Sequence, residues 1–330
     1  MTATQCMRTT AFLVCLVASL SAQSVATTDS QLLVGILEEV PGVYVGEATH
    51  YGVRVLFQQD GENWRSFPDE CRNADCLASI TSQYPVFTRW SVSYEGRPLG
   101  TIAARTPSDF KFYSHIGIQD IEAGQSPPVI GVPTADYSGY QETPIHRPLM
   151  ATTNAPQLGP AHAGWTSQPA NPSDLKQVWP LFSQLVPLID DCRLDSHGED
   201  IPSNGRAPHR NELEIAKKLV NRGGDAIFQA RVRAIAFKDC DGPSTYRTEF
   251  WFYGETTGKI WPLPGQTPGI SGAGAGKAER AQLAMPLDFV DIRGNGGDVA
   301  LFLMDGDDAG GYALYYDGFR KVATFTWLYH

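Results

Sequence analysis

The sequence lacks the long apolar run that a membrane-spanning helix requires. Its most apolar stretch, AFLVCLVASL, covers only residues 11–20, whereas a helix that crosses a bilayer needs about 20 residues. Arg8 is the only charged residue before this stretch. A short apolar core behind a positive charge is typical of a signal peptide, and small residues place its cleavage after Ala22 or Ala26. We therefore expect residues 1–26 to be a signal peptide and the chain to be exported, to the periplasm or the medium.

Basic residues are also few. The chain has 26 Lys and Arg against 36 Asp and Glu, which gives a net charge of −10, and loss of Arg8 with the signal peptide would make it −11. No basic cluster interrupts this acidic balance. A protein of this charge is repelled by phosphate backbones and by anionic lipids. The composition therefore argues against nucleic acid as a partner.

Cysteine is scarce, with six residues in the chain, two of which would leave with the signal peptide. An even number of cysteines in an exported chain favours disulfides. We expect one bridge in each half of the chain, Cys71–Cys76 and Cys192–Cys240. A zinc site made by the four cysteines is the alternative, but the chain has no C-x-x-C pair, and Cys192 and Cys240 are 48 positions apart.

Complete catalytic motifs are missing. The chain contains no G-x-S-x-G and no H-E-x-x-H, and no two of its seven His stand at i,i+2 or i,i+4 spacing. These absences exclude the nucleophile elbow and the helical zinc motif. The stretch GAGAGK at residues 272–277 resembles a phosphate-binding loop, but it lacks the first Gly and the final Ser or Thr of that motif. We expect a mobile loop over residues 269–277.

Three partial patterns remain. Ser173 and Lys176 match the S-x-x-K of penicillin-recognising enzymes, but no S-D-N or K-T-G follows, and Ser173 is also a natural helix N-cap. The stretch CRLDSHGED at residues 192–200 gathers acids around His197 and predicts either a catalytic or metal cluster or a polar loop; KDCDG at residues 238–242 predicts a turn. We assign no catalytic residue, no cofactor-binding residue and no metal ligand.

Alternating apolar and polar residues predict strands in the first half. VRVLF at residues 53–57 and RWSVSYEG at residues 89–96 each place their apolar side chains on one face, with turns at Asp60-Gly61 and Glu95-Gly96. We expect residues 27–150 to form a β-rich domain.

A stretch rich in Pro, Ala, Ser and Thr, residues 151–173, predicts a linker or long surface loop before an α+β domain over residues 174–330. Helical spacing predicts one helix that starts at the N-cap Ser173, is kinked or split by Pro180 and is ended by Pro187. NELEIAKKLVNRGG at residues 211–224 predicts a second helix.

That second helix would have a capping box from Asn211 to Glu214, an ion pair between Glu214 and Lys218, and a C-terminal turn at Gly223. Strands are predicted at residues 226–237 and 249–254.

The last residues predict a three-stranded meander with strands at 299–304, 312–316 and 322–329 and a turn at Asp317-Gly318. Its aromatic face is either core or a platform on which carbohydrate rings stack. The fold class expected for the chain is α+β and mainly β, with antiparallel sheets and a few helices opening the second half.

The stretch DIRGNGGD at residues 291–298 has part of a calcium loop. Asp291 and Asn295 occupy two of the ligand positions, and Gly296 supplies the sharp turn. Arg293 stands where another ligand oxygen is expected, and Val299 stands where an acid is expected. A guanidinium has no lone pair for a cation, so two of the side-chain oxygens are missing.

The order of residues 291–304, DIRGNGGDVALFLM, resembles a single degenerate FG-GAP or VCBS-type repeat, in which an acidic loop leads directly into an apolar strand. The resemblance implies calcium at the acidic positions, which here are Asp291 and Asn295. This tail and the stretch from VRVLF to VSYEGRPLG are also similar to exported bacterial proteins without an assigned function.

Three hypotheses for the function follow. The first is an exported, disulfide-stabilised binding or structural protein whose ligand is an unknown protein or surface. The second is a secreted hydrolase with a triad assembled from distant residues. The third is a calcium-dependent adhesion module. A pocket with a Ser–His–acid or paired-carboxylate geometry would distinguish the hydrolase from the binding protein.

Overall fold

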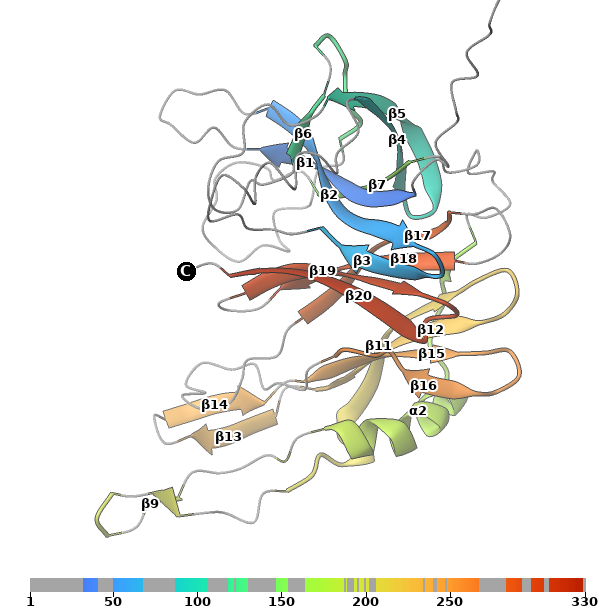
Figure 1. Ribbon diagram of the computed structural model, residues 1–330. Helices are drawn as coiled ribbons and strands as arrows, with labels where there is room; N and C mark the ends of the chain where they lie inside the picture. Colours follow the sequence, from blue (N-terminus) through green and yellow to red (C-terminus); the bar gives the residue numbers. More distant parts are fainter. Residues whose placement is uncertain are drawn as a thin grey trace, which may run out of the picture. The chain divides into compact units, whose positions relative to one another are not determined.

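The computed structural model of the 330-residue chain is shown in Figure 1. Apart from residues 1–30, the chain clusters as one unit, Gln31–His330, and only that unit is considered below. The structure describes residues 32–40, 50–67, 87–105, 118–121, 123–129, 147–153, 164–186, 188, 193–194, 196–198, 200–201, 206–233, 235–239, 242–246, 248–266, 283–292, 298–305 and 309–328.

Antiparallel strands form most of this unit, which confirms the predicted fold class. The first sheet has the order β3-β2-β1-β7-β4-β5, and β6 pairs with β2 away from this path. Its strands are β1 (Leu33–Val40), β2 (His50–Asp60), β3 (Asn63–Ser66), β4 (Phe87–Tyr94), β5 (Arg97–Arg105), β6 (Ile118–Asp120) and β7 (Leu149–Thr153). The predicted turns at Asp60-Gly61 and Glu95-Gly96 join β2 to β3 and β4 to β5.

The first sheet closes on itself. Strand β6 pairs with β2, and just after β6 Ile121 forms an antiparallel bridge with Ala104 of β5. The side chain of Gln125 adds two hydrogen bonds to the backbone of Ala103, at 2.8 and 2.9 Å, as a further strand would. The enclosed core consists of Leu33, Leu37, Val53, Val55, Phe67, Trp90, Val92, Ile102, Ala104, Leu149 and Ala151.

The central sheet has the order β17-β18-β19-β20, one strand more than the predicted meander. Its strands are β17 (Leu283–Asp291), β18 (Asp298–Asp305), β19 (Ala309–Tyr316) and β20 (Lys321–Leu328). One face packs on β1, β2, β3 and β7 of the first sheet through Leu287, Val290, Ile292, Val299, Leu301, Tyr312, Leu314, Tyr316, Ala323 and Phe325. The other face contributes Phe289, Ala300, Phe302, Met304, Ala313 and Tyr315 to a second core.

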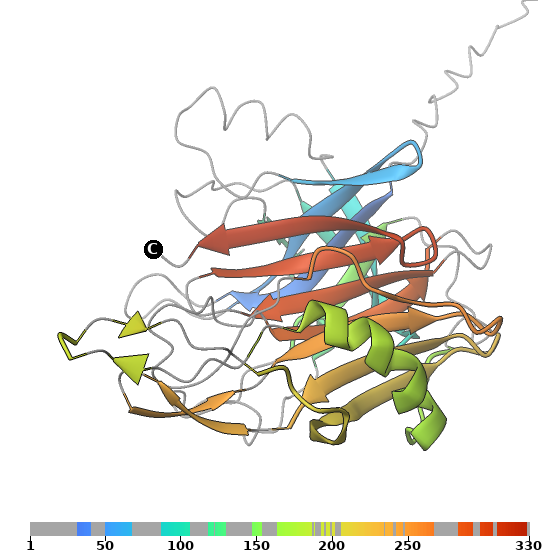
Figure 2. The same cartoon turned by 90° about the horizontal axis from the view of Figure 1, so that it is seen from below.

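The third sheet, in the order β16-β15-β12-β11-β8, completes that second core. Its strands are β8 (Thr166–Ser167), β11 (Leu213–Val220), β12 (Ala226–Val232), β15 (Glu249–Gly254) and β16 (Ile260–Pro262). Its far face is covered by the helix α2 (Pro172–Leu185), as Figure 2 shows. Two small hairpins pair β9 (Arg193–Leu194) with β10 (Asp200–Ile201) and β13 (Ile235–Asp239) with β14 (Gly242–Tyr246).

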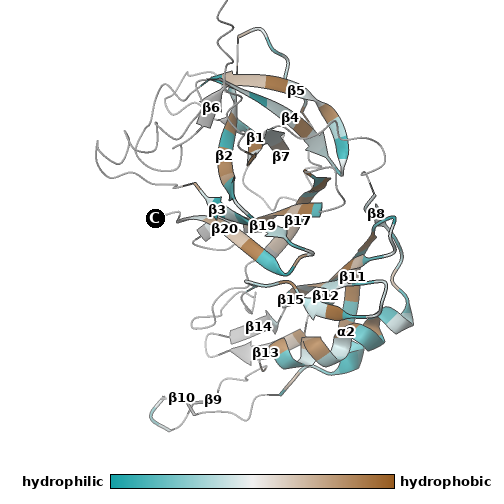
Figure 3. Ribbon diagram, turned by 45° about the vertical axis from the view of Figure 1, so that its right-hand side comes forward, coloured by the Kyte–Doolittle hydropathy of each residue, from teal (hydrophilic) through white to brown (hydrophobic). Residues whose placement is uncertain are grey.

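Helix α2 matches the predicted apolar face, and its brown and teal segments alternate in Figure 3. Val178 and Phe182 are fully buried against the third sheet. The helix is not split at Pro180, because this residue lies on the exposed side. The carbonyl of Lys176, also on the exposed side, loses its helical partner there but can bind water.

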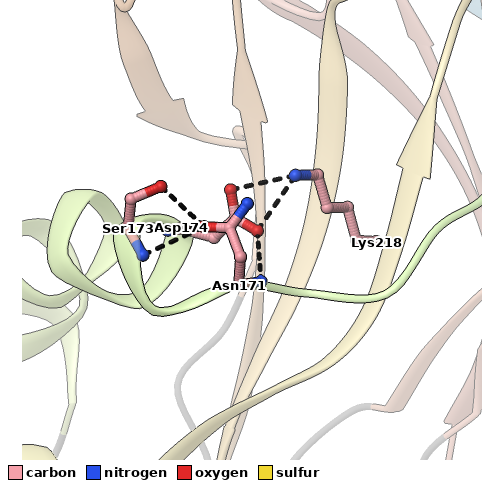
Figure 4. Close-up of polar contacts among 4 residues, drawn as sticks. All are labelled: Asn171, Ser173, Asp174 and Lys218. Atoms are coloured by element: carbon pink, nitrogen blue, oxygen red, sulfur yellow. Dashed lines mark hydrogen bonds and ion pairs between the residues drawn. The ribbon is translucent and has the colours of Figure 1, made fainter.

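The N-cap of α2 is Asn171 and not Ser173. The Asn171 side-chain oxygen accepts hydrogen bonds from the backbone N–H groups of Ser173, at 2.9 Å, and Asp174, at 3.0 Å (Figure 4). The Asp174 carboxylate accepts in return from the Asn171 N–H at 2.8 Å, which completes a capping box. The hydroxyl of Ser173 donates to Asn171 at 2.6 Å and so supports the cap from inside the helix.

The predicted helix at residues 211–224 is wrong, because residues 213–220 form the strand β11. Its register shifts between Ile215 and Lys217, where Ala216 is an extra residue opposite β12. A bulge breaks the two-residue alternation of a strand, and the apolar residues then fall at spacings that imitate a helix. The expected partners also differ: Glu214 binds Arg231 and Arg233, while Lys218 binds Asp174.

Strand β15 coincides with the prediction, whereas the run predicted at 226–237 is divided between β12 and β13. The segment predicted as a linker, 151–173, begins inside β7 and contains β8 and the start of α2. Core residues from both predicted domains share one cluster. The four cysteines and the loop at 269–277 lie outside the described residues.

No helix among the described residues combines the length and the apolar character needed to span a membrane.

We expect Asn171→Ala to lower the free energy of unfolding by about 1 kcal/mol, because two backbone N–H groups lose their acceptor. The matched control, Ser173→Ala, leaves those two bonds in place and should cost less than about 0.5 kcal/mol. Denaturant unfolding of both variants measures the difference. A larger loss from Ser173→Ala would contradict the assignment of Asn171 as the cap.

Candidate functional site

Three strand bulges place polar residues where the sheets meet. The extra residues are Ala216 in β11, Leu287 in β17 and Leu99 in β5, the last opposite Val92 and Ser93 of β4. Bulges redirect side chains and occur often beside functional sites. Together with the β4–β5 turn and one cation near β7, the polar residues beside these bulges form what we term the bulge cluster, which consists of Ser93, Glu95, Gly96, Arg147, Lys217 and Asp288.

Asp288 is the buried centre of the cluster, with 1 % of its surface exposed. It pairs with Leu301, which faces the first sheet, and the bulge at Leu287 turns Asp288 toward the same side. Its carboxylate accepts hydrogen bonds from the Ser93 hydroxyl at 2.6 Å and from the backbone N–H of Gly96 at 2.5 Å and of Phe289 at 2.7 Å. Asp288 thereby fastens the β4–β5 hairpin to the edge of the central sheet.

Burial raises the pKa of Asp288 to about 6, although the hydrogen bonds from Ser93, Gly96 and Phe289 and the positive charge of Arg147 all act to lower it. Desolvation therefore outweighs the three donors and the cation. The carboxyl group therefore changes its charge near pH 6.

Arg147 closes the open edge of β17. Its Nη2 donates to the carbonyl oxygen of Pro286 at 2.7 Å, and its guanidinium lies 5.3 Å from the centre of the Tyr94 ring. The Nε of Arg147 is buried and has no hydrogen-bond partner among the described residues. One donor of this guanidinium is therefore unused.

Lys217 lies on the face of the third sheet that is turned to the central sheet, because of the bulge in β11. Ile215 packs on the helix side of the third sheet, whereas Leu219 packs on the side of the central sheet. In a regular strand residues 215, 217 and 219 would share one face, but the extra residue puts Lys217 on the face of Leu219. Burial and then the charge of Arg147 lower the pKa of Lys217, and the charge of Glu95 opposes them.

Glu95 and Gly96 bring the hairpin turn to this place. Both have positive φ, 49° and 70°, which is the backbone geometry of a two-residue turn that matches the twist of its strands. The turn directs the Gly96 N–H at Asp288 and leaves the Glu95 side chain exposed.

The chain was compared with models of protein families, with curated proteins and with solved structures. None of them matches. The chemistry of the site therefore has to be argued from the geometry of this chain alone.

The arrangement of the bulge cluster favours binding of a charged group over nucleophilic attack on a substrate. Ser93 is only 1 % exposed, and its hydroxyl proton is directed at Asp288, so no carbonyl carbon can approach it in this conformation. The carboxylate of Asp288 already receives three hydrogen bonds. Within the part of the chain that the structure describes, the Nε of Arg147 is the donor of this cluster that is buried without a hydrogen-bond partner.

The S-x-x-K pattern predicted at Ser173 serves the helix instead. Asp174, the next residue, is 5 % exposed and accepts from Lys218 Nζ at 2.9 and 3.0 Å (Figure 4). This ion pair anchors the first turn of α2 to β11, and the Lys218 ammonium lies 5.5 Å from the centre of the Phe228 ring. Lys176 is exposed.

The partial calcium loop is described only at its ends. Asp291 ends β17, is 1 % exposed and pairs in register with Asp298, the first residue of β18. Asp298 accepts a hydrogen bond from Trp165 Nε1 at 3.0 Å. Arg293, Asn295 and Gly296 lie outside the described residues, so calcium at this loop stays a prediction.

The acidic stretch at residues 192–200 contains the hairpin of β9 and β10, with His197 exposed between them, as expected of a polar turn. Within the described part of the chain, no three His, Cys, Asp or Glu side chains gather as a metal site.

Sequence patterns missed the bulge cluster, because its members lie up to 195 positions apart. One signal was present: Asp288 is the single charged residue within LAMPLDFV, an apolar run that also carries a proline. A proline in a strand points to an edge, and a buried acid on an edge strand points to a specific partner.

We expect the free energy of unfolding of the wild type to fall with rising pH because of Asp288, and we expect Asp288→Asn to lack this decrease. The unfolded chain ionises this group at its ordinary pKa of 3.8, whereas the folded chain keeps the proton until about pH 6. The wild type should therefore lose on the order of 3 kcal/mol relative to the variant between about pH 4 and pH 6.5. Denaturant unfolding of both proteins across this range gives the difference.

The exposed Asp60→Asn controls for removal of one negative charge at the surface, and it should change the free energy of unfolding by less than about 0.5 kcal/mol. A constant difference between wild type and Asp288→Asn would show that Asp288 does not titrate in this range.

Proposed function

We propose that the chain is an exported, disulfide-stabilised protein that binds a ligand and does not catalyse a reaction on it. The observation that carries the proposal is the division of roles within the bulge cluster. The groups able to act as nucleophile or base, Ser93 and Asp288, are buried and joined to each other. The guanidinium of Arg147, a group able to attract a ligand, keeps one donor without a partner among the described residues.

Export and disulfides are supported by the sequence. The short apolar core at residues 11–20 follows a positive charge, and four cysteines remain after the signal peptide. The pairing proposed is Cys71–Cys76 and Cys192–Cys240. In an oxidising compartment such bridges would add stability to a chain that has to persist outside the cell.

The hydrolase alternative receives less support from the geometry. A serine hydrolase needs an accessible nucleophile with a base in reach and an oxyanion site beside it. Ser93 has an acid within 2.6 Å but almost no exposed surface. Tight burial of both groups is what an interlocking contact between two sheets requires.

One preparation tests the proposal. The full chain is expressed with its own signal in a bacterial host, recovered from the periplasm, and weighed by intact mass spectrometry. We expect cleavage after Ala22 or Ala26, no thiol that accepts an alkylating reagent before reduction, and four that accept it afterwards. A serine-directed fluorophosphonate should leave the mass unchanged.

The Ser93→Ala variant is the matched control for the serine probe. A fluorophosphonate adduct that maps to Ser93 in the wild type and is absent from Ser93→Ala would contradict the proposed binding function. It would support the hydrolase alternative instead. An unprocessed chain with four free thiols would instead remove the exported, disulfide-bonded part of the proposal.

A further inference from the structure

Most edge strands of the three large sheets are short, interrupted or covered by side chains. Strands β3, β8 and β16 have four, two and three residues. Strand β5 contains Pro98 and the extra residue Leu99, and the Gln125 side chain is hydrogen-bonded to its backbone. Trp251 and Arg147 donate to backbone carbonyls of β17. These are the ways in which natural sheets protect their edges from pairing with another chain.

Strand β20 has none of these protections among the described residues. It is eight residues long, it pairs with β19 on one side, and its register has no bulge. Its last seven residues, VATFTWL, contain no charge, proline or glycine. No described strand pairs with its other side, and Figure 2 shows it at the outer edge of the central sheet. Such an edge is a template for another extended strand.

The side chains of β20 leave room for a neighbouring strand. Ala323 and Phe325 point into the core shared with the first sheet. Val322 packs against the core shared with the third sheet, and Thr324 and Thr326 follow it on the same face of the strand. Both threonines are exposed, so the third sheet does not cover this part of β20.

The sequence of β20 is matched to itself. If two copies pair antiparallel about a two-fold axis at Phe325, Thr324 lies opposite the partner's Thr326, and Thr326 lies opposite the partner's Thr324. Both cross-strand pairs on the exposed face are then Thr–Thr, which is a favourable pair. Residues 322–328 also bring no charge to the axis, although the chain as a whole carries −10 and repels its own copies.

The first sheet has an edge at the same place. Its edge strand β3 lies close to β20, where Lys321 Nζ donates to Asn63 Oδ1 at 3.4 Å, and Trp64 of β3 shares a core with Phe325. A second copy that pairs with β20 therefore meets the edges of two stacked sheets, which enlarges the contact beyond a single strand.

We propose that two copies of the chain pair along β20, antiparallel and about a two-fold axis at Phe325, so that two four-stranded central sheets become one continuous sheet. A second copy fits this edge because a two-fold axis lets the same strand serve as both partners, and β20 is matched to itself. The proposal goes beyond ligand binding and does not depend on it.

Sedimentation velocity of the processed, oxidised full chain, over concentrations up to its solubility limit, tests the pairing. We expect a reversible equilibrium between monomer and dimer and no larger species, because a two-fold contact closes on itself. A monomer at every concentration overturns the proposal. Growth past the dimer also overturns it, because only a contact between unlike surfaces continues in that way.

Two double variants on the exposed threonines test the register. Thr324→Lys/Thr326→Lys places Lys opposite Lys twice and should weaken dimerisation by about tenfold or more. Thr324→Lys/Thr326→Glu places Lys opposite Glu twice and should dimerise at least as well as the wild type. The control, Thr101→Lys/Thr257→Lys, adds the same charge as the first variant at exposed sites outside β20 and should leave the equilibrium unchanged.

Two results with these variants contradict the proposal. If the Lys/Lys variant dimerises as well as the wild type, the contact does not involve the threonine face of β20. If the Lys/Lys and Lys/Glu variants are weakened equally, the strands do not pair about Phe325.

Hydrogen exchange of the wild type protects the test if a variant fails to fold. Amides of residues 321–328 should exchange more slowly at concentrations where the dimer forms than in the dilute monomer. Amides of β18, which is paired on both sides, should exchange alike in both samples. A dimer in which residues 321–328 gain no protection places the contact elsewhere and overturns the proposal. The fluorophosphonate result stands in either case, so the dimer and the proposed function can fail separately.

Discussion

The central sheet is buried on both faces, and this constraint determines most of what surrounds it. Its strands send alternate side chains into two cores, one shared with the first sheet and one shared with the third sheet. Around Asp288 neither face of the sheet is open to solvent, whereas Thr324 and Thr326 of the opposite edge strand, β20, are exposed. Asp288, the acid that interrupts it, therefore needs three donors and a neighbouring cation, and even so it holds its proton to about pH 6.

Edge strands of such a sheet also have to be protected from pairing with another chain. In this protein the protected edge strand is β17, which also carries Asp288 of the candidate site. Strand β17 has a paired neighbour on one side only. On its open side, the carbonyl of Ala284 accepts from Trp251 Nε1 at 2.9 Å, and that of Pro286 accepts from Arg147 at 2.7 Å. Side chains thus replace the missing strand, and they bring cationic and aromatic groups to one place. The bulge cluster can be understood as edge protection that leaves one donor, the Nε of Arg147, without a partner among the described residues.

Local patterns were sufficient where a strand is regular. The alternation around Trp90 and Val92, the turn at Glu95-Gly96 and the run at residues 249–254 were all found from sequence because packing follows a period of two. The apolar side of α2 was found because its period is 3.6, although Asn171 and not Ser173 caps it. The prediction of a helix at residues 213–220 is wrong for a specific reason. The extra residue, Ala216, changes which side chains of this strand share a face. The site itself could not be found, because it depends on three such interruptions in strands that pair only after the sheets assemble.

The position of the central sheet in the chain has a consequence for the order of assembly. Its strands come from residues 283–328, whereas both sheets that rest on it are made from earlier residues. During synthesis, the first and third sheets emerge with apolar faces that have nothing to cover them, and contacts such as that between Ser93 and Asp288 close over 195 positions. Chains with such long-range contacts fold slowly and are prone to associate while they wait. Both cores can therefore close only after residues 283–328 have been made, so the apolar faces of the first and third sheets stay open until the chain is nearly finished.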